Sequence, residues 1–391
     1  MDVEGWVASA HPEMVGLRRA LHRIPEVGFE EVKTARFVAA RLRELGLAVR
    51  EGVGKTGVVA DLSGSAPGPR VLLRADMDAL PIPEETGAPH ASEHAGRMHA
   101  CGHDGHMAVL LAAARFFSEN RAGFPGSLRF VFQPGEEGFA GARAMIEDGL
   151  LEGGVDAALA LHLWQPLGLG RVWVRPGPFM AAMDVFDLTV KGRSAHGAAP
   201  HAGVDALVAA SHIVSAFQSV VAREVNPLHA AVVTVGTVRG GRARNIICEE
   251  VVMEGTCRTL DSDLRETLPW RLDRLAGGVA AAFSASHRLE YTHLYPVLEN
   301  DPRICEVVAE AARGVVGCEN VTPGEPQMVS EDFSFVCERV PGAMFYVGAG
   351  GEGFPHPHHH PKFDFDEAAL AHGARILIGA ALRLLSGGLP A

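Results

Sequence analysis

The chain has 391 residues, of which 47% are hydrophobic, and a formal net charge of -12 at pH 7. A chain of this length exceeds what one hydrophobic core usually supports, so we expect two domains. The acidic balance and the absence of any Lys/Arg-rich run argue against nucleic acid or an anionic membrane as a partner, and they favour a small polar substrate.

Six cysteines are scattered along the chain, at positions 101, 248, 257, 305, 318 and 337, with no Cys-x-x-Cys pair. Such spacing is typical of a reducing compartment rather than of a disulfide framework. The first residues lack the basic and apolar segments of a signal peptide, and no run reaches the ~18 apolar residues of a membrane span. We therefore expect a cytoplasmic protein with no membrane partner.

The first elements in the chain are two predicted helices followed by two predicted strands. Apolar residues at helical spacing predict helices over residues 13–24 and 30–45, and extended runs predict strands over 57–62 and 71–75. The second strand is continuously apolar, as a buried strand would be, and it ends at Arg74-Ala75-Asp76-Met77-Asp78. Open α/β sheets bind their ligands just past the carboxyl ends of such strands.

A dense polar motif follows, His99-Ala100-Cys101-Gly102-His103-Asp104-Gly105-His106, and it opens a predicted helix over 105–117. Thiolate and neutral imidazole are ligands that borderline-soft divalent metals prefer, and Cys101 and His103 can approach one ion from a turn. Within the helix, we expect His106 to pack or to support a ligand rather than to bind metal. A nucleophile and base pair, Cys101 with His103, is the alternative interpretation.

Two more predicted strands end in residues that can bind metal. The strand over 128–132 leads to Gln133-Pro134-Gly135-Glu136-Glu137-Gly138, and the strand over 157–161 leads to His162. A loop with four histidines at positions 356–360 lies between the predicted strand over 343–347 and a closing helix, so at least one of these histidines is a candidate ligand.

These candidates are too many for one four-coordinate site with an open position. They suit two ions, roughly 3.5–4 Å apart, that share a bridging ligand and a water, and Cys101 is the candidate that can bridge as sulfur. Of the adjacent Glu136 and Glu137, one can bind metal while the other acts as general base. We expect Asp78 and Asp104 to orient ligands, and we leave the role of Asp76 open.

The pattern changes near residue 185, where the predicted order becomes strand, helix, two strands, helix, strand. This is the split βαβ plan of an α+β ferredoxin-like domain. We assign residues 184–296 to such an inserted domain and residues 1–183 and 297–391 to a discontinuous α/β domain with a mixed central sheet and flanking helices. Hinges are expected near Met183 and Pro296.

The order of seven short motifs resembles the aminoacylase, carboxypeptidase G and dipeptidase superfamily of metallopeptidases. The chain is similar to its amidohydrolase branch, which contains hippurate hydrolases and plant indole-acetyl-amino-acid hydrolases. Each motif is weak alone, but their shared order from about Leu17 to Leu385 is specific. The motifs are Asp76-Met77-Asp78-Ala79-Leu80-Pro81, His99 to His106, Gln133 to Gly138, Leu161-His162-Leu163-Trp164, Gly192-Arg193-Ser194-Ala195-His196-Gly197, Gly255-Thr256-Cys257-Arg258-Thr259 and His359-His360-Pro361-Lys362-Phe363.

The resemblance implies a zinc-peptidase-like catalytic domain with two divalent metal ions and an inserted lid and dimerisation domain. It implies Glu136 as the base and five metal ligands, which are Cys101, His103, Glu137, His162 and His359. It also implies that His196 reaches the site of a partner subunit in a homodimer or homotetramer. Asn245 and Arg258 match positions that hold a substrate carboxylate, although a purely structural role in a hairpin is an equal alternative.

The resemblance thus implies metal-dependent hydrolysis of the amide bond of N-acyl amino acids such as hippurate, releasing a carboxylic acid and a free amino acid. The mixed thiolate, imidazole and carboxylate ligands allow Zn, Mn, Co or Ni. Alternatives are a dipeptidase, a deacetylase acting on an N-acetyl-amino acid of the diaminopimelate type, and a non-catalytic metal-binding scaffold.

Overall fold

The protein is described by a computed structural model that covers residues 1–387 and divides into two compact units. Unit 1 comprises Met1–Gly177, Glu299–Glu325 and Asp332 onward, and unit 2 comprises Pro178–Leu298 and Pro326–Glu331. The sequence analysis assigned the short segment Pro326–Glu331 to the catalytic domain. Its contacts assign it to unit 2, because Gln327 and Val329 both accept hydrogen bonds from the backbone N–H of Ala181.

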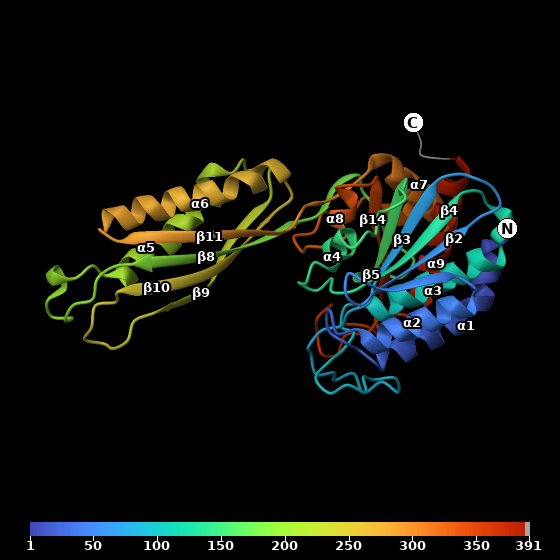
Figure 1. The fold of residues 1–391 in the computed structure, drawn as a ribbon, viewed down its shortest axis with the longest axis horizontal. Coiled ribbons are helices and arrows are strands. Elements are labelled where there is room, and N and C mark those ends of the chain that lie inside the picture. The colour runs from blue at the N-terminus through green and yellow to red at the C-terminus, as the bar shows by residue number, and fades with distance from the viewer. Residues whose placement is uncertain (388–391) are drawn as a thin grey trace. The chain divides into compact units, whose positions relative to one another are not determined.

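Unit 1 is built on a mixed eight-stranded sheet (Figure 1). Its four central strands run parallel and are almost wholly buried, which explains their continuously apolar sequences. The exposed edge strand β1 has no such sequence signal and was not predicted. In sheet order the strands are β1 (Ala48–Val53), β2 (Gly57–Ser63), β4 (Ser127–Gln133), β3 (Arg70–Asp76), β5 (Ala157–Gly168), β14 (Gly342–Gly350), β6 (Val172–Trp173) and β13 (Val321–Thr322).

The long helices of unit 1 are α1 (Val3–His22), α3 (His103–Glu119) and α9 (Ala368–Gly387), which contact one another (Figure 1). Helix α1 begins ten residues before the predicted start, because Asp2 accepts a hydrogen bond from the N–H of Gly5 and caps the helix. The remaining helices of four or more residues are α2 (Val32–Glu44), α4 (Gly141–Glu147), α7 (Pro302–Val316) and α8 (Ser334–Cys337).

Unit 2 is an antiparallel four-stranded sheet in the order β11-β8-β10-β9 with two helices, and this confirms the expected ferredoxin-like plan. The elements are β8 (Ala182–Lys191), α5 (Ala206–Ser219), β9 (Ala231–Gly240), β10 (Glu250–Thr259), α6 (Ser262–Ala282) and β11 (Ser286–Tyr295). Separately, β7 (Gly177–Met180) pairs with β12 (Leu298–Asn300).

Two helical segments are long and apolar enough to cross a membrane by length and composition alone, Ala206–Glu224 and Ala368–Gly387. The first contributes six buried side chains to the core of unit 2, and 61% of the most apolar window of the second is buried. Core helices pass the same test, so the expectation of no membrane partner stays a prediction.

Candidate metal centre

Cys101 and His103 flank a sharp turn at the start of α3. Gly102 forms this turn with a φ of 88°, in the left-handed region that side chains other than glycine rarely adopt. His103 is the first residue of α3, and the carbonyl of Gly102 accepts hydrogen bonds from the N–H groups of Gly105 and His106. The Cys-Gly-His spacing therefore sets the positions of a thiol and an imidazole on the two sides of one turn.

The five candidate ligands form two groups that share Cys101. One group is Cys101, His103 and His162, and the other is Cys101, Glu137 and His359; within each group the ligand atoms lie within 4.8 Å of one another. Cys101 Sγ is 3.5 Å from His162 Nε2, and Glu137 Oε1 is 3.0 Å from His359 Nε2. One sulfur common to two groups is the arrangement that a bridging thiolate between two ions requires.

His103 is oriented by the backbone and carboxylate of Asp78. The Nδ1 of His103 lies 2.8 Å from the carbonyl oxygen of Asp78, to which it donates, and Asp78 Oδ2 accepts the N–H of Glu137 at 2.9 Å. The other ring nitrogen, His103 Nε2, is buried and has no hydrogen-bond partner among the described residues, and it faces Asp76 Oδ2 at 3.6 Å. A buried ring nitrogen without a hydrogen bond is costly, and a divalent cation at this position would satisfy it. The donor set therefore fits a metal ion.

Of the histidines at 356–360, the structure brings His359 to the other candidate ligands. Its backbone adopts φ 65°, and its N–H donates to the carbonyl of Ala100, next to Cys101. His356 and His360 stack on each other instead, and His358 stacks on Trp164. Backbone geometry thus separates one histidine of the run from its neighbours.

The pKa values around the site disfavour nucleophilic catalysis by a cysteine without a bound metal and leave one neutral imidazole for a cation. Burial, together with Glu137 and Glu136, raises the pKa of the Cys101 thiol well above its usual range. A nucleophilic cysteine needs a lowered pKa, so this environment disfavours the Cys101–His103 nucleophile pair. Burial and the neighbouring His106 hold the pKa of His162 well below its usual range, which leaves a neutral ring that can bind a cation.

Burial alone would lower the pKa of His103, but Asp76 and Asp78 outweigh it and raise the value to about 10. The ring is therefore protonated at neutral pH in the metal-free protein. A cation bound at this position would take the place of that proton.

Glu136 lies beside the ligand groups and is 7% exposed. A carboxylate oxygen of Glu136 is within 4.8 Å of ligand atoms of His103 and Glu137. The loop that carries it is held by the N–H of Gly135, which donates to Glu31 Oε1 at 2.9 Å. The structure therefore places a candidate base, Glu136, next to a candidate ligand, Glu137, at adjacent positions in the chain.

Asp104 and His106 point to partners other than the ligand atoms. Asp104 accepts hydrogen bonds from Arg18 Nε at 2.8 Å and from His22 Nδ1 at 2.7 Å. Both ring nitrogens of His106 are used, one by Asp76 at 2.6 Å and one by the N–H of Leu163 at 2.9 Å. His106 therefore supports the site from behind.

Arg74 and His358, which were not predicted as part of the site, contact residues behind the ligands. Arg74 donates to Asp76, and His358 Nε2 lies 3.1 Å from the carbonyl oxygen of Leu163. A signal for Arg74 was present, because it is a charged residue inside an otherwise apolar strand. His358 had no signal that distinguished it from the other histidines of its loop.

The remaining candidates lie in unit 2, where they do not form one cluster. His196 and Asn245 are in adjacent loops, since the N–H of Gly197 donates to the carbonyl of Asn245 at 2.7 Å. His196 follows the C-terminal end of β8, and Asn245 precedes the N-terminal end of β10. Arg258 lies eight residues beyond Glu250 along β10, which at about 3.4 Å per residue is roughly 27 Å. The sheet of one subunit therefore separates Arg258 from His196.

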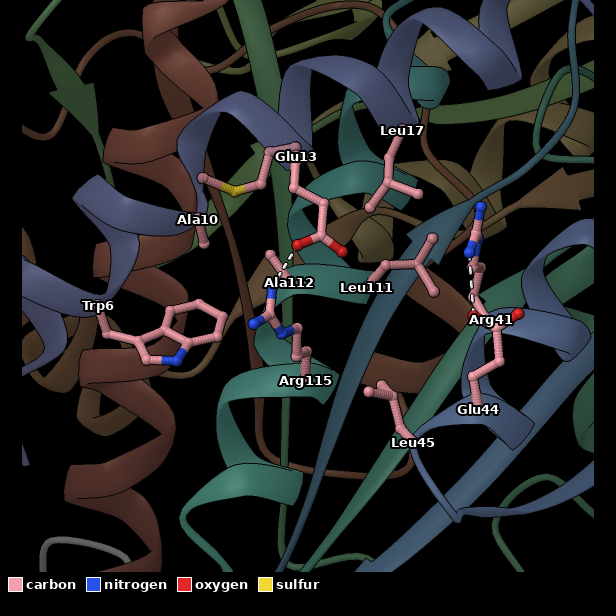
Figure 2. A pocket seen from close by; sticks show the side chains of 11 residues that line it. Trp6, Ala10, Glu13, Leu17, Arg41, Glu44, Leu45, Leu111, Ala112 and Arg115 are labelled. Carbon is pink, nitrogen blue, oxygen red and sulfur yellow. Dashed lines mark hydrogen bonds and ion pairs between the residues drawn. The ribbon is translucent and has the colours of Figure 1, made fainter.

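A cavity of about 60 Å³ between α1, α2 and α3 is lined by Trp6, Leu17 and Leu111, and ion pairs Glu13–Arg115 and Arg41–Glu44 lie at its side (Figure 2). Sites for small molecules usually enclose about 300–1,000 Å³. This gap contains neither Cys nor His and is far too small for an acyl amino acid, so we assign it to imperfect helix packing.

Comparisons with known proteins agree with this geometry. A model described as peptidase family M20/M25/M40 matches residues 72–383. An N-acetyl-L-cysteine deacetylase from Bacillus subtilis is 41% identical over 97% of this chain and 90% of its own length, and an N-acetyldiaminopimelate deacetylase from a Geobacillus species is 36% identical over 93% and 96%. A solved structure of a dinuclear metal-binding peptidase of the M20 family from Bacillus subtilis superposes with a TM-score of 0.85 at 34% identity, covering 97% of this chain and 99% of that one.

Proposed function

Because the chain belongs to peptidase family M20/M25/M40 and is therefore a hydrolase of amide bonds, we propose that it cleaves N-acyl amino acids to a carboxylic acid and a free amino acid. The observation that carries this proposal is the pair of ligand groups joined at Cys101, with Glu136 beside them. A metal store would need the ligands but not the additional buried carboxylate, so the arrangement favours a hydrolase over a binding scaffold.

Cys101, His103, Glu137, His162 and His359 would hold two divalent ions, for which Zn, Mn, Co and Ni remain candidates. When bound, such ions supply Lewis acidity toward the acyl oxygen and lower the pKa of water. Glu136 would take the proton of the attacking water and return it to the leaving amine nitrogen. Its position within 4.8 Å of His103 and Glu137 ligand atoms supports this role.

We propose that Arg258 of one subunit and Asn245 of a second copy bind the substrate carboxylate, and that His196 of the second copy hydrogen-bonds the reacting carbonyl of the substrate. Arg258 is suited to an anion, because it forms no ion pair among residues 1–387 and donates only to its neighbour's carbonyl. The separation of His196 from Arg258 within one subunit supports a contribution from a second copy.

A second copy would fit the β9 edge of unit 2. Strand β9 is an open edge that exposes Val232 and Val238 at 42% and 50%. The opposite edge, β11, exposes the charged side chains of Arg288 and Glu290 instead. Charged side chains discourage edge pairing, whereas an apolar edge favours it. We therefore propose a homodimer formed through β9, and a cytoplasmic enzyme as expected from the cysteine pattern.

Two substrate classes are candidates, and they differ in the acyl group. Hippurate-like compounds are the substrate class that the sequence motifs imply, whereas the names of the two relatives point to N-acetyl groups. A substrate panel should therefore contain N-benzoyl, N-acetyl and longer N-acyl derivatives of several amino acids, together with free dipeptides.

The test is metal analysis of the purified protein and turnover of this panel before and after chelation. We expect two divalent ions per chain, release of the acid and the amino acid from at least one N-acyl amino acid, and recovery of turnover when metal is restored. A protein that holds two ions but cleaves nothing in the panel would instead support the scaffold alternative.

A further inference from the structure

A buried hydrogen-bond chain runs behind the ligand His162. We propose that His106, held by Asp76 and Arg74, is a positioning residue that fixes the strand end carrying His162 and thereby the affinity of one of the two metal ions. The inference rests on the proposed metal centre, and it concerns residues outside the five proposed ligands.

The hydrogen-bond chain starts at the N–H of Leu163, a donor that the sheet leaves unpaired. Pairing between β3 and β5 ends at Arg74 and Ala160, so β5 has no neighbour on that side at Leu163. The N–H of Ala158 donates to Pro341, on the side of β14. Because successive N–H groups of a strand point to opposite sides, the N–H of Leu163 points toward the side that β3 has left. A buried N–H without an acceptor is costly.

His106 supplies that acceptor. Its Nε2 accepts the N–H of Leu163 at 2.9 Å, so its proton is on Nδ1, which donates to Asp76 Oδ1 at 2.6 Å. The ring of His106 and the carboxylate of Asp76 are buried, with exposed fractions of 1% and 0%. Both ring nitrogens are therefore committed to the protein, in a single tautomer.

Arg74 fixes Asp76 from the opposite side. Its Nη1 donates to Asp76 Oδ2 at 2.8 Å, its Nε donates to Gln133 Oε1 at 2.8 Å, and its Nη2 donates to Asp332 Oδ1 at 3.1 Å. Asp332 in turn accepts the N–H of Ala142 at the start of α4. The carboxylate that orients His106 is thus anchored to three separate segments of unit 1.

The peptide of Leu163 connects His106 to the ligand. Its carbonyl oxygen lies 3.0 Å from His162 Nδ1, which donates to it and turns His162 Nε2 toward Cys101 Sγ. The same oxygen lies 3.1 Å from Nε2 of His358. Losing His106 would free the Leu163 peptide and with it the orientation of His162. Loss of a partner that orients a ligand typically weakens metal binding about 10- to 100-fold.

The test is titration of the metal-free protein with Co²⁺ and with Mn²⁺ by calorimetry, which resolves the two binding steps. His106→Phe keeps a planar ring but removes both hydrogen bonds, and we expect it to weaken one step about 10- to 100-fold and the other less than about 3-fold. Asp76→Asn keeps an acceptor for His106 but loses the charge, and we expect a smaller loss in the same step.

The matched control is His99→Phe. His99 is also a buried imidazole, 1% exposed, but neither of its ring nitrogens has a hydrogen-bond partner among the described residues. We expect this variant to bind both ions as the unchanged protein does. If it weakens the same step as strongly as His106→Phe, general disruption of packing explains the effect and the inference is overturned.

The inference is also overturned if His106→Phe binds both ions with unchanged affinity. Should His106→Phe fail to fold, Asp76→Asn decides in its place, and unchanged affinity in both steps overturns the inference. An unchanged protein that binds no divalent ion refutes the proposed metal centre itself, which distinguishes the failure of the proposed function from the failure of this inference.

Discussion

In unit 1 the candidate ligands converge on Cys101, whereas in unit 2 the candidate substrate contacts His196 and Arg258 lie at opposite ends of a sheet. The ligands of unit 1 are supported by buried partners such as Asp78 and His106. His196 and Asn245 are exposed and have mostly backbone neighbours. A centre built from buried groups is preorganised within one subunit, while dispersed exposed groups need another copy or a closing motion to act together.

The largest effect is expected from the candidate base in unit 1. Glu136→Gln keeps the shape of the side chain but cannot accept a proton, so turnover should fall about 10³-fold while metal content is unchanged. Steady-state kinetics and metal analysis measure the two quantities. The control is Glu147→Gln, an exposed carboxylate on α4. Turnover of Glu136→Gln within about 10-fold of the unchanged protein would contradict the assigned role.

The second largest effect is the pH dependence of the free energy of unfolding that arises from buried His22 and its carboxylate partners. Burial alone would lower the pKa of His22, but Asp104 and Glu84 outweigh it and raise the value to about 9. The unfolded chain loses this proton near pH 6.5, so the stabilisation is complete below pH 6.5 and is lost as the pH rises through 9. The free energy of unfolding should fall by on the order of 3 kcal/mol over that range.

Denaturant unfolding of the metal-free protein at pH 6.5 and pH 9 measures this difference. His22→Gln should reduce the pH dependence and leave the part that comes from His103, whose pKa is also raised, to about 10, whereas His201→Gln, an exposed histidine of unit 2, should leave it unchanged. If His22→Gln and His201→Gln show the same pH dependence of stability, the ion pairs of His22 do not cause it.

The third prediction concerns His196, through which the two regions would meet. If it donates to the reacting carbonyl in a partner's site, His196→Ala should lower kcat about 100-fold. Mixing His196→Ala with Glu136→Gln should then restore substantial turnover, because each mixed dimer contains one site with an intact Glu136 and an intact His196. Absence of any recovery after subunit exchange would argue against action on a partner's site.

The smallest effect is expected at Arg258. Arg258→Ala should raise KM for an N-acyl amino acid about 10-fold and leave kcat nearly unchanged, because it removes a charged hydrogen bond to a carboxylate distant from the reacting bond. Kinetics on a substrate and on its carboxamide analogue measure this. The matched control is Arg288→Ala, an arginine on the opposite edge strand β11 that is paired with Glu290. An equal loss on the carboxamide would rule out carboxylate binding.

Local patterns predicted the elements that position the site. The continuous apolar run before Asp76 predicted a buried strand, and the alternating segments after residue 185 predicted the four strands of unit 2. Strand β1 escaped prediction because most of its side chains are exposed, so it lacks a burial pattern. The start of α1 was misplaced because its helix passes through Pro12, a residue that usually marks a boundary.

The sequence by itself indicated the candidate ligand types, because Cys101 and His103 stand in a dense polar motif and Glu137 and His162 each follow an apolar strand. The family resemblance implied His359 among the histidines at 356–360, and the tertiary structure shows how this residue reaches the other candidates, through a backbone hydrogen bond from its N–H to Ala100. The tertiary structure also supplied the partners of His106 and of Asp76, whose role the sequence left open. Their hydrogen bonds to Arg74 and Leu163 join segments distant in the chain, and such partners are fixed only when the strands pack side by side.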